Sequence, residues 1–335
     1  MLLEVQNVTE EAYQERNRTH DEVRHQGAIG NLNEGIEITT QNVSTRLIAW
    51  PGNGFQTESV HVLTLKPGDE TQLYRYDLSE EAYLCLRGSG EIFLRGQWIT
   101  IEAGDLAFFP RGIEHGARNT STNGKDFVLV NSISSPPFDL YESAGFYDKA
   151  KGVMKLDLIE RAKKAAQSGN LTTDYEIHFS ENNPEVRSWN LDVHDIVQNG
   201  ALFNVYKGAS TGVLAMPMVF LLWPGYGINS VGFHYGSTGP NVRSLVHKHP
   251  VSDECLIRFG GTGQFYCGDK WVDIGPLDCV LAPCGVLHGA AASENADKEQ
   301  SFVGGFASPP QLDLYVRSPY YQDGKFAQPE YVMLK

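Results

Sequence analysis

Three histidines and a glutamate stand at spacings that suit a metal site. One residue separates His247 from His249, Glu254 follows after a short turn through Pro250, and His288 comes later in the chain. Successive side chains of a strand point to opposite faces, so the imidazoles of His247 and His249 should point the same way. Three neutral imidazole nitrogens and one carboxylate suit iron(II), manganese(II), nickel(II) or copper(II), with coordination positions left for water, substrate or oxygen. These four residues are the predicted metal ligands.

The elements that must position these ligands occur twice in the chain. The stretch WPGNG begins at Trp50 and WPGYG begins at Trp223, a shift of 173 residues (223 − 50 = 173). The same shift relates further residues of rare types, namely His61 to His234, Glu81 to Glu254, Trp98 to Trp271, Pro110 to Pro283 and His115 to His288. Agreement at so many rare residues under one shift predicts two copies of one domain.

Each copy has the sequence pattern of β-structure. Short segments rich in β-branched and aromatic residues, such as SVHVLTL and GEIFLRG, are separated by Gly, Pro or Asp, which indicates an antiparallel sandwich or barrel. The clearest helix is LDLIERAKKAAQSG, which has apolar residues at helical spacing and Gly169 as a C-terminal cap. It lies between the copies and is predicted to connect them. Segments 1–40 and 171–215 are expected to add strands or arms that pack on the barrels.

Composition narrows the location and the partners. The chain has 335 residues, of which 41% are hydrophobic, and this suits two domains. Five cysteines without a C-x-x-C pair argue against a disulfide framework and predict a reducing, cytoplasmic location. No export signal and no membrane-length apolar run are present, so no membrane partner is expected. A formal net charge of −14 would repel a phosphate backbone, so nucleic acid is not an expected partner.

The motifs of the second copy resemble the paired motif of the cupin family. That motif reads G-x-x-x-x-x-H-x-H-x-x-x-x-E-x-x-x-x-x-x-G, followed by G-x-x-x-x-x-P-x-G-x-x-H-x-x-x-N. The matching residues of the second copy are His247, His249, Glu254, Gly261, Pro283, Gly285 and His288. Leu277 and Ala292 stand where the second motif has its first Gly and its Asn. In the first copy, GDLAFFPRGIEHGARN matches the second motif throughout.

The resemblance covers roughly residues 45–145 and 218–320. Cupins are double-sheet jelly rolls, so the resemblance implies an all-β fold with two tandem cupin barrels joined by a short helix, a bicupin. We predict an N-terminal cupin domain with a degenerate metal site at residues 1–152. The connecting helix and a C-terminal cupin domain with the metal site are predicted at residues 153–335.

The first copy departs from the cupin motif at the His-x-His pair. Tyr74 and Tyr76 stand at these two positions, although Glu81 and His115 remain. A phenol with a pKa of about 10 is protonated at neutral pH and is a poor ligand for divalent ions. We therefore predict one divalent metal ion per chain, with iron(II) first and manganese, nickel or copper as alternatives. The first copy is predicted to be structural, or alternatively a pocket lined by tyrosines.

Other residues of the second copy are candidates for contact with a substrate. Arg258 lies four residues past Glu254 on the same strand face, where it would bind a substrate carboxylate or phenolate, or form an internal ion pair. Arg243 has the same two interpretations. His234 is interpreted as a packing residue next to the ligands or as a substrate contact. The predicted apolar wall of the cavity, which is equally compatible with ordinary core packing, consists of Phe265, Phe302 and Phe306.

The family resemblance implies several kinds of function, because bicupins include oxygenases, decarboxylases, isomerases and binding proteins. We predict a metal-dependent dioxygenase that cleaves a phenolic, quinol or enediol substrate in aromatic degradation, since one competent barrel resembles the quercetin dioxygenases. Glu254 is its predicted base toward the phenol proton. One alternative is a manganese-type decarboxylase or oxidase of a small carboxylic acid, as in the oxalate-degrading bicupins, although these normally carry ligands in both barrels.

Another alternative is a non-enzymatic metal-containing cupin that binds a small molecule. The expected partners are a small-molecule substrate, molecular oxygen and further copies of the chain. The likeness to hydroquinone dioxygenases adds a second, smaller subunit as a further candidate, although those enzymes carry Asn where His249 stands.

Overall fold

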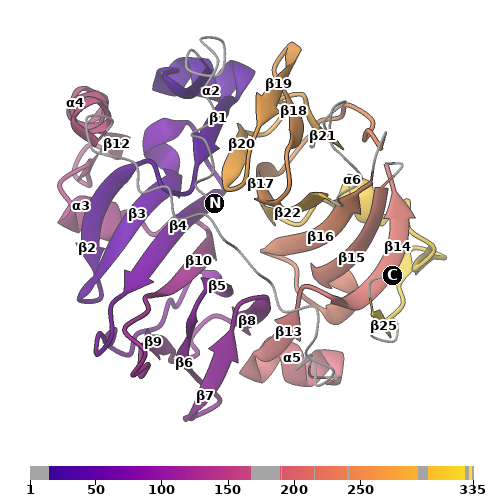
Figure 1. Cartoon of the computed structure of the whole chain (residues 1–335), viewed down its shortest axis with the longest axis horizontal. Helices are drawn as coiled ribbons and strands as arrows, with labels where there is room; N and C mark the ends of the chain where they lie inside the picture. Colours follow the sequence, from indigo (N-terminus) through magenta and orange to yellow (C-terminus); the bar gives the residue numbers. More distant parts are fainter. Residues whose placement is uncertain are drawn as a thin grey trace.

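Two β-barrels lie side by side, the first in indigo to magenta and the second in orange to yellow (Figure 1). This confirms the predicted all-β fold of two tandem jelly-roll domains. The computed structural model describes residues 15–166, 189, 191–214, 216–239, 242–292, 301–328 and 332–333. None of the helices in these ranges combines the length and apolarity that a membrane span needs.

The first barrel consists of a larger and a smaller antiparallel sheet. The strands of its larger sheet are β2 (Ile36–Thr40), β3 (Val43–Ala49), β4 (Glu58–Leu65), β5 (Glu80–Arg87), β8 (Asp105–Phe109) and β10 (Phe127–Ser134). The smaller sheet contains β6 (Ser89–Leu94), β7 (Gln97–Glu102) and β9 (Gly116–Arg118). Strands β4, β5 and β10 are buried along almost their whole length, because one face fills the barrel and the other packs against the second barrel.

The second barrel repeats this plan. Its larger sheet contains β14 (Lys207–Val213), β15 (Met216–Leu222), β16 (Gly232–Thr238), β17 (Asp253–Gly260), β20 (Asp278–Ala282) and β22 (Ser301–Ser308). Its smaller sheet contains β18 (Gly263–Cys267), β19 (Lys270–Ile274) and β21 (His288–Ala292). One apolar core includes residues of both barrels, among them Val62 and Phe108 from the first and Phe220 and Phe306 from the second. The two halves are therefore packed as one body.

Each barrel also receives a strand from the other half of the sequence. Strand β1 (Ala28–Asn31) pairs antiparallel with β20 of the second barrel. Strand β13 (Ala201–Asn204) pairs with β8 of the first barrel before the chain turns into β14. These are the extra strands expected in segments 1–40 and 171–215, and they cross the predicted division at residue 152. Because β13 pairs with both β8 and β14, it joins the larger sheets into one sheet of 15 strands.

The connecting helix is α4 (Leu156–Ala166). Its buried Ile159 belongs to a small apolar cluster with Trp50 and Tyr141, so the helix packs on the first barrel, although the sequence placed it with the second domain. The predicted cap Gly169 lies outside the described residues. The remaining helices are α2 (His20–Gln26), α3 (Phe138–Ser143), α5 (Val193–Asn199), α6 (Leu312–Tyr315), and the short 3-10 turns η1 (Pro51–Asn53) and η2 (Pro224–Tyr226). The short strands are β11 (Tyr147–Asp148), β12 (Val153–Met154), β23 (Tyr321–Gln322), β24 (Lys325–Phe326) and β25 (Val332–Met333).

The repeated W-P-G sequence has a packing reason in both barrels. The ring of Trp50 lies against Gly52, where a Cβ would come within 2.4 Å of the ring, and the ring of Trp223 lies against Gly225 at 2.2 Å. Both tryptophans are almost fully buried. Only glycine leaves room for the indole at this corner, so the repeat marks one structural turn in each copy.

Candidate metal centre

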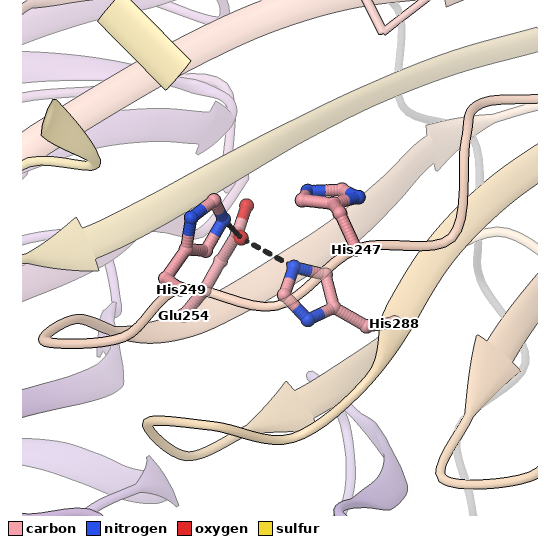
Figure 2. Close-up of side chains that lie close together, drawn as sticks. All are labelled: His247, His249, Glu254 and His288. Atoms are coloured by element: carbon pink, nitrogen blue, oxygen red, sulfur yellow. Dashed lines mark hydrogen bonds and ion pairs between the residues drawn. The ribbon is translucent and has the colours of Figure 1, made fainter. Parts of the chain in front are cut away.

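The four predicted ligand residues meet inside the second barrel. One side-chain atom from each of His247, His249, Glu254 and His288 lies within 4.8 Å of the other three. Figure 2 shows His249 and His288 on two sides of the Glu254 carboxylate, with His247 facing them. His249, Glu254 and His288 are buried and His247 is partly exposed, so the group is open toward solvent on the side of His247.

Three different elements supply these side chains. His247 and His249 lie in the segment between β16 and β17, not in a regular strand, and the backbone of His247 pairs with that of His288. Glu254 is near the start of β17, and His288 is the first residue of β21. The extended backbone around the paired residue still turns the rings of His247 and His249 to one side, as strand alternation predicted.

Each histidine ring is fixed in orientation by its Nδ1 atom. Nδ1 of His247 lies 2.9 Å from the carbonyl of Leu245, and Nδ1 of His288 lies 3.0 Å from the carbonyl of Val286. A carbonyl only accepts hydrogen bonds, so both Nδ1 atoms carry the proton and the Nε2 atoms keep a lone pair. The lone pairs of Nε2 are the atoms that a metal ion would bind.

The contacts of Glu254 require a cation within the group. Its Oε2 atom lies 2.9 Å from Nε2 of His249 and 2.8 Å from Nε2 of His288. In a neutral His288 ring the only N–H is at Nδ1, where it donates to the Val286 carbonyl. The contact with Glu254 would then place the lone pair of Nε2 against a lone pair of the carboxylate. An additional proton or a metal ion between the atoms makes it favourable, and the first barrel has the same contact between His115 and Glu81. The second barrel differs in its donor set, because three imidazoles and one carboxylate fit a divalent metal ion.

The charges of the group agree with this interpretation. Burial alone would raise the pKa of the Glu254 carboxyl, but the adjacent His288 and His249 hold it well below its usual range. Burial lowers the pKa of His247 to about 3, so this ring is neutral as a metal ligand must be. For His249, burial would lower the pKa, but hydrogen bonds to Asp313 and Glu254 outweigh it and raise the pKa to about 9. A metal ion would displace this proton.

Asp313 belongs to the site, although the sequence did not indicate it. Its carboxylate oxygens lie 3.0 and 3.1 Å from Nδ1 of His249, and it is carried by α6 in the repeated D-L-Y segment. The corresponding Asp139 of the first copy instead binds the exposed Lys149 at 2.9 Å. A carboxylate behind a ligand histidine fixes the ring and raises its basicity. The repeated D-L-Y sequence could be seen in the chain, but nothing in the sequence indicated that Asp313 would lie next to His249.

A pocket borders the ligand group. Its wall is mainly apolar and consists of Leu214, Met216, Met218, Leu256, Ala290, Val303 and Leu314. Its polar side chains are His234, Ser244, His247 and Glu254. No Lys or Arg lines it within the ranges that the structure describes. The pocket thus combines one carboxylate with an apolar wall and offers no cationic side chain to a second anion.

Two of the predicted wall residues face away from this pocket. On β22, Val303 lines the pocket, and a Cβ on Gly305 would lie 2.3 Å from Oε1 of Glu254. Because side chains alternate along a strand, Phe302 and Phe306 point to the other face. Phe302 stacks on Tyr235 with ring centroids 5.7 Å apart, and Phe306 belongs to the core shared by the barrels. Their prediction as pocket walls was wrong.

The two arginines and Phe265 also lie outside the pocket wall, which corrects their prediction as substrate contacts. Arg258 is fully buried, and its guanidinium donates to the Thr238 hydroxyl at 3.1 Å and the Ala291 carbonyl at 3.0 Å, over the ring of Phe265. Burial lowers the pKa of Arg258 to about 9. Arg243 is exposed and lies over the ring of Trp271. Among the six candidate substrate contacts, only His234 lines the pocket.

In the first barrel, protein groups satisfy the carboxylate that corresponds to Glu254. Glu81 accepts hydrogen bonds from the Tyr74 hydroxyl at 3.0 Å and from the Asn131 amide at 2.6 Å, and it lies 2.7 Å from Nε2 of His115. Burial raises the pKa of Tyr74 and of Tyr76 well above the usual value, so both phenols stay protonated. Within the described ranges, only the second barrel brings three or more such ligand residues together. An absence of metal from the first barrel stays a prediction.

Comparison with known proteins agrees with this architecture. The cupin domain family matches residues 61–131. An uncharacterized protein of Aquifex aeolicus is 37% identical over 57 residues, a stretch that covers 17% of this chain and 44% of that relative. This chain therefore matches less than half the length of that relative.

Solved structures cover most of the chain at low identity. The putative glyoxylate-induced protein from Pseudomonas aeruginosa has a TM-score of 0.55 and 12% identity, covering 84% of this chain and 89% of its own. Protein Ylba from E. coli has a TM-score of 0.55 and 10% identity, covering 85% and 91%. Oxalate decarboxylase of Lactobacillus farciminis, in a formate complex, has a TM-score of 0.53 and 14% identity, covering 91% and 88%. Such likeness shows the fold, which is that of a bicupin, and leaves the reaction to the site.

Proposed function

We propose that the second barrel of this bicupin binds one divalent metal ion and, with molecular oxygen, cleaves a phenolic, quinol or enediol substrate. The ligands are His247, His249, Glu254 and His288, with iron(II) as the first candidate and manganese, nickel and copper as alternatives. A metal ion bound there would act as a Lewis acid on a substrate oxygen and would donate electron density to molecular oxygen. The partners in this reaction are a small molecule and molecular oxygen.

The composition of the pocket wall supports this choice over a small dicarboxylate. One carboxylate of a diacid could be neutralised by the metal ion, but the other would lie in an apolar pocket beside Glu254, where the described wall residues include no Lys or Arg. Burial of an unpaired charge is strongly unfavourable. A phenol, quinol or enediol brings one ionised oxygen to the metal and no second charge at neutral pH, so its other atoms can lie beside the leucine and methionine side chains without an unpaired charge. The apolar wall beside the four ligand residues is the observation on which the proposal rests.

The residues of the chain have separate roles in this reaction. His247, His249 and His288 hold the metal ion, and Asp313 orients His249. Glu254 Oε1 lies 3.7 Å from Nε2 of His234, whereas Oε2 contacts the ligand rings, so Oε1 is the oxygen that accepts the substrate hydroxyl proton. The apolar wall excludes water from the reacting oxygens.

Oxygen uptake with a panel of substrates tests the proposal. Protein loaded with iron(II) is supplied with catechol, hydroquinone, gentisate, a flavonol or oxalate, and both oxygen consumption and products are measured. We expect oxygen-dependent cleavage of at least one phenol or enediol, loss of that activity in His249→Ala, and its retention in Tyr76→Phe, the matched change in the first barrel. Carbon dioxide released from oxalate without ring or double-bond cleavage would instead favour a decarboxylase. Tightly bound metal without any turnover would favour a non-enzymatic binding protein.

Two further proposals concern assembly. We expect the chain to form homo-oligomers, and a smaller second subunit is the alternative. The molar mass of the native protein in solution, measured by light scattering after purification from its source cells, distinguishes these possibilities.

A further inference from the structure

The two barrels place a histidine at the same position but surround it differently. His61 on β4 pairs with Asn131 on β10, and His234 on β16 pairs with Gly305 on β22. Both rings are almost completely buried. In the first barrel, Nε2 of His61 lies 2.9 Å from the hydroxyl of Tyr141, so the ring has a fixed partner.

The second barrel has lost this partner. The Tyr141 hydroxyl donates to Ser59 in the first barrel at 2.6 Å. The residue corresponding to Ser59 is Gly232, and the tyrosine corresponding to Tyr141 is Tyr315, whose hydroxyl donates to Gln311 at 3.0 Å. His234 is left without the tyrosine that holds its counterpart.

The nitrogen atoms of His234 are consequently available to a ligand. Its Nδ1 atom is buried and has no hydrogen-bond partner among the residues that the structure describes. Its Nε2 atom lies 3.7 Å from Oε1 of Glu254, which is longer than a hydrogen bond. A buried polar atom without a partner is rare in folded proteins and calls for an explanation such as a bound ligand.

The surroundings of His234 point to a ligand in the pocket next to the metal ligands. His234 lines that pocket together with Glu254. Both side chains pack closely against β22 at Gly305, where a Cβ would lie 2.3 Å from Oε1 of Glu254 and 2.9 Å from Cε1 of His234. In the first barrel Asn131 occupies the paired position and donates to Glu81. In the second barrel Glu254 and His234 therefore occupy the place that the Asn131 side chain takes in the first.

We propose that His234 hydrogen-bonds the second of two adjacent oxygens of the substrate, while the first oxygen binds the metal ion that the four ligands would hold. This inference rests on the proposed function and narrows its substrate class to vicinal diols, such as catechols and enediols. A 1,4-diol places its second oxygen on the far side of the ring, away from both groups. His234 acts here as a hydrogen-bonding residue that orients the substrate and selects it.

Anaerobic binding measurements test this selectivity without turnover. Protein carrying one equivalent of iron(II) is titrated calorimetrically with catechol, phenol and hydroquinone. The variants are His234→Leu, His234→Gln and, as the matched change in the first barrel, His61→Leu. The metal content of each variant is measured first.

We expect the wild type and His61→Leu to prefer catechol over phenol and hydroquinone. His234→Leu should weaken catechol binding by about tenfold, the usual effect of one hydrogen bond, and leave phenol binding unchanged. His234→Gln, which keeps a donor and an acceptor, should recover part of the loss.

Several outcomes would overturn the inference. A diol that binds the metal through both oxygens would keep its full affinity in His234→Leu. Loss of metal from both His234 variants would show that the residue supports the ligands and does not contact substrate. If the wild type holds its metal but binds none of the three probes and consumes no oxygen with the substrate panel, the proposed function itself fails, which separates that failure from a failure of His234 alone.

Discussion

Gly305→Ala is expected to abolish tight metal binding without unfolding the protein. The added Cβ would lie 2.3 Å from Oε1 of Glu254, 2.9 Å from Cε1 of His234 and 3.2 Å from Cδ1 of Leu256. The backbone of Gly305 does not need a conformation restricted to glycine, because its φ is not positive. The change therefore acts through the clash of the new methyl group with its neighbours, of which the Glu254 carboxylate is the closest.

The size of the effect follows from these distances. To bring the contact to 3.0 Å, the shortest that real Cβ atoms show, the carboxylate must retreat by at least 0.7 Å. His234 and Leu256 close the other sides, so the added methyl group cannot turn away. Metal–ligand distances tolerate deviations of only about 0.2 Å. A displaced ligand should weaken metal binding at least as much as the loss of a supporting group, which costs about 10- to 100-fold.

The assay compares metal affinity and stability in Gly305→Ala and Gly304→Ala. Gly304 is adjacent on β22 but faces the opposite side, where a Cβ would lie 2.9 Å from the backbone carbonyl of His234, 2.9 Å from the ring of Phe259 and 3.0 Å from that of Phe233. We expect Gly304→Ala to lower the free energy of unfolding while keeping its metal affinity. Gly305→Ala should lose metal affinity in a chelator competition. Wild-type affinity in Gly305→Ala would mean that Glu254 is not a ligand in the position described.

Two further predictions concern charged groups around the barrels. Asp313→Asn should weaken metal binding about 10- to 100-fold, because the His249 ring loses a charged partner. The matched change in the first barrel, Asp139→Asn, should leave the metal affinity unchanged. Equilibrium dialysis measures the affinity of both variants. Burial raises the pKa of the Glu58 carboxyl well above its usual value, although a hydrogen bond from Ser132 opposes the shift. The folded state then keeps this proton to higher pH than the unfolded state, so the stability of the wild type should fall as pH rises above about 4.3, by at most about 1.4 kcal/mol per pH unit. Glu58→Gln should lack this decline in urea unfolding at pH 5, 6.5 and 8; parallel curves for both proteins would contradict it.

The ligand residues could be predicted from sequence because their geometry is local. One residue separates His247 from His249, and a single turn leads to Glu254, so the spacing alone brings three side chains to one side. The repeat supplied the fourth, since His288 has a counterpart at the same shift. The departure of the first copy from the ligand motif was visible in Tyr74, which stands where the second copy has His247.

The remaining features depend on tertiary contacts that the sequence does not encode locally. The register of β22 against β16 and β17 decides to which side of the sheet Phe302 and Phe306 point. The sequence does not show this register, so these two residues could not be told apart from aromatic residues that line the pocket. Asp313 reaches His249 only because α6 folds back over the barrel. Strands β1 and β13 have four residues each, too few for a clear alternation, and their exchange depends on edges provided by the other barrel.

Metal stoichiometry tests the central claim most directly. The protein is purified without added metal, reconstituted with iron(II), and its bound metal per chain is measured by mass spectrometry beside His247→Ala, His249→Ala and Tyr74→Phe. We predict one ion per chain in the wild type and in Tyr74→Phe, and none in stoichiometric amount in the two histidine variants, since each removes a ligand. Two ions per chain, or full metal content in either histidine variant, would contradict a single site in the second barrel.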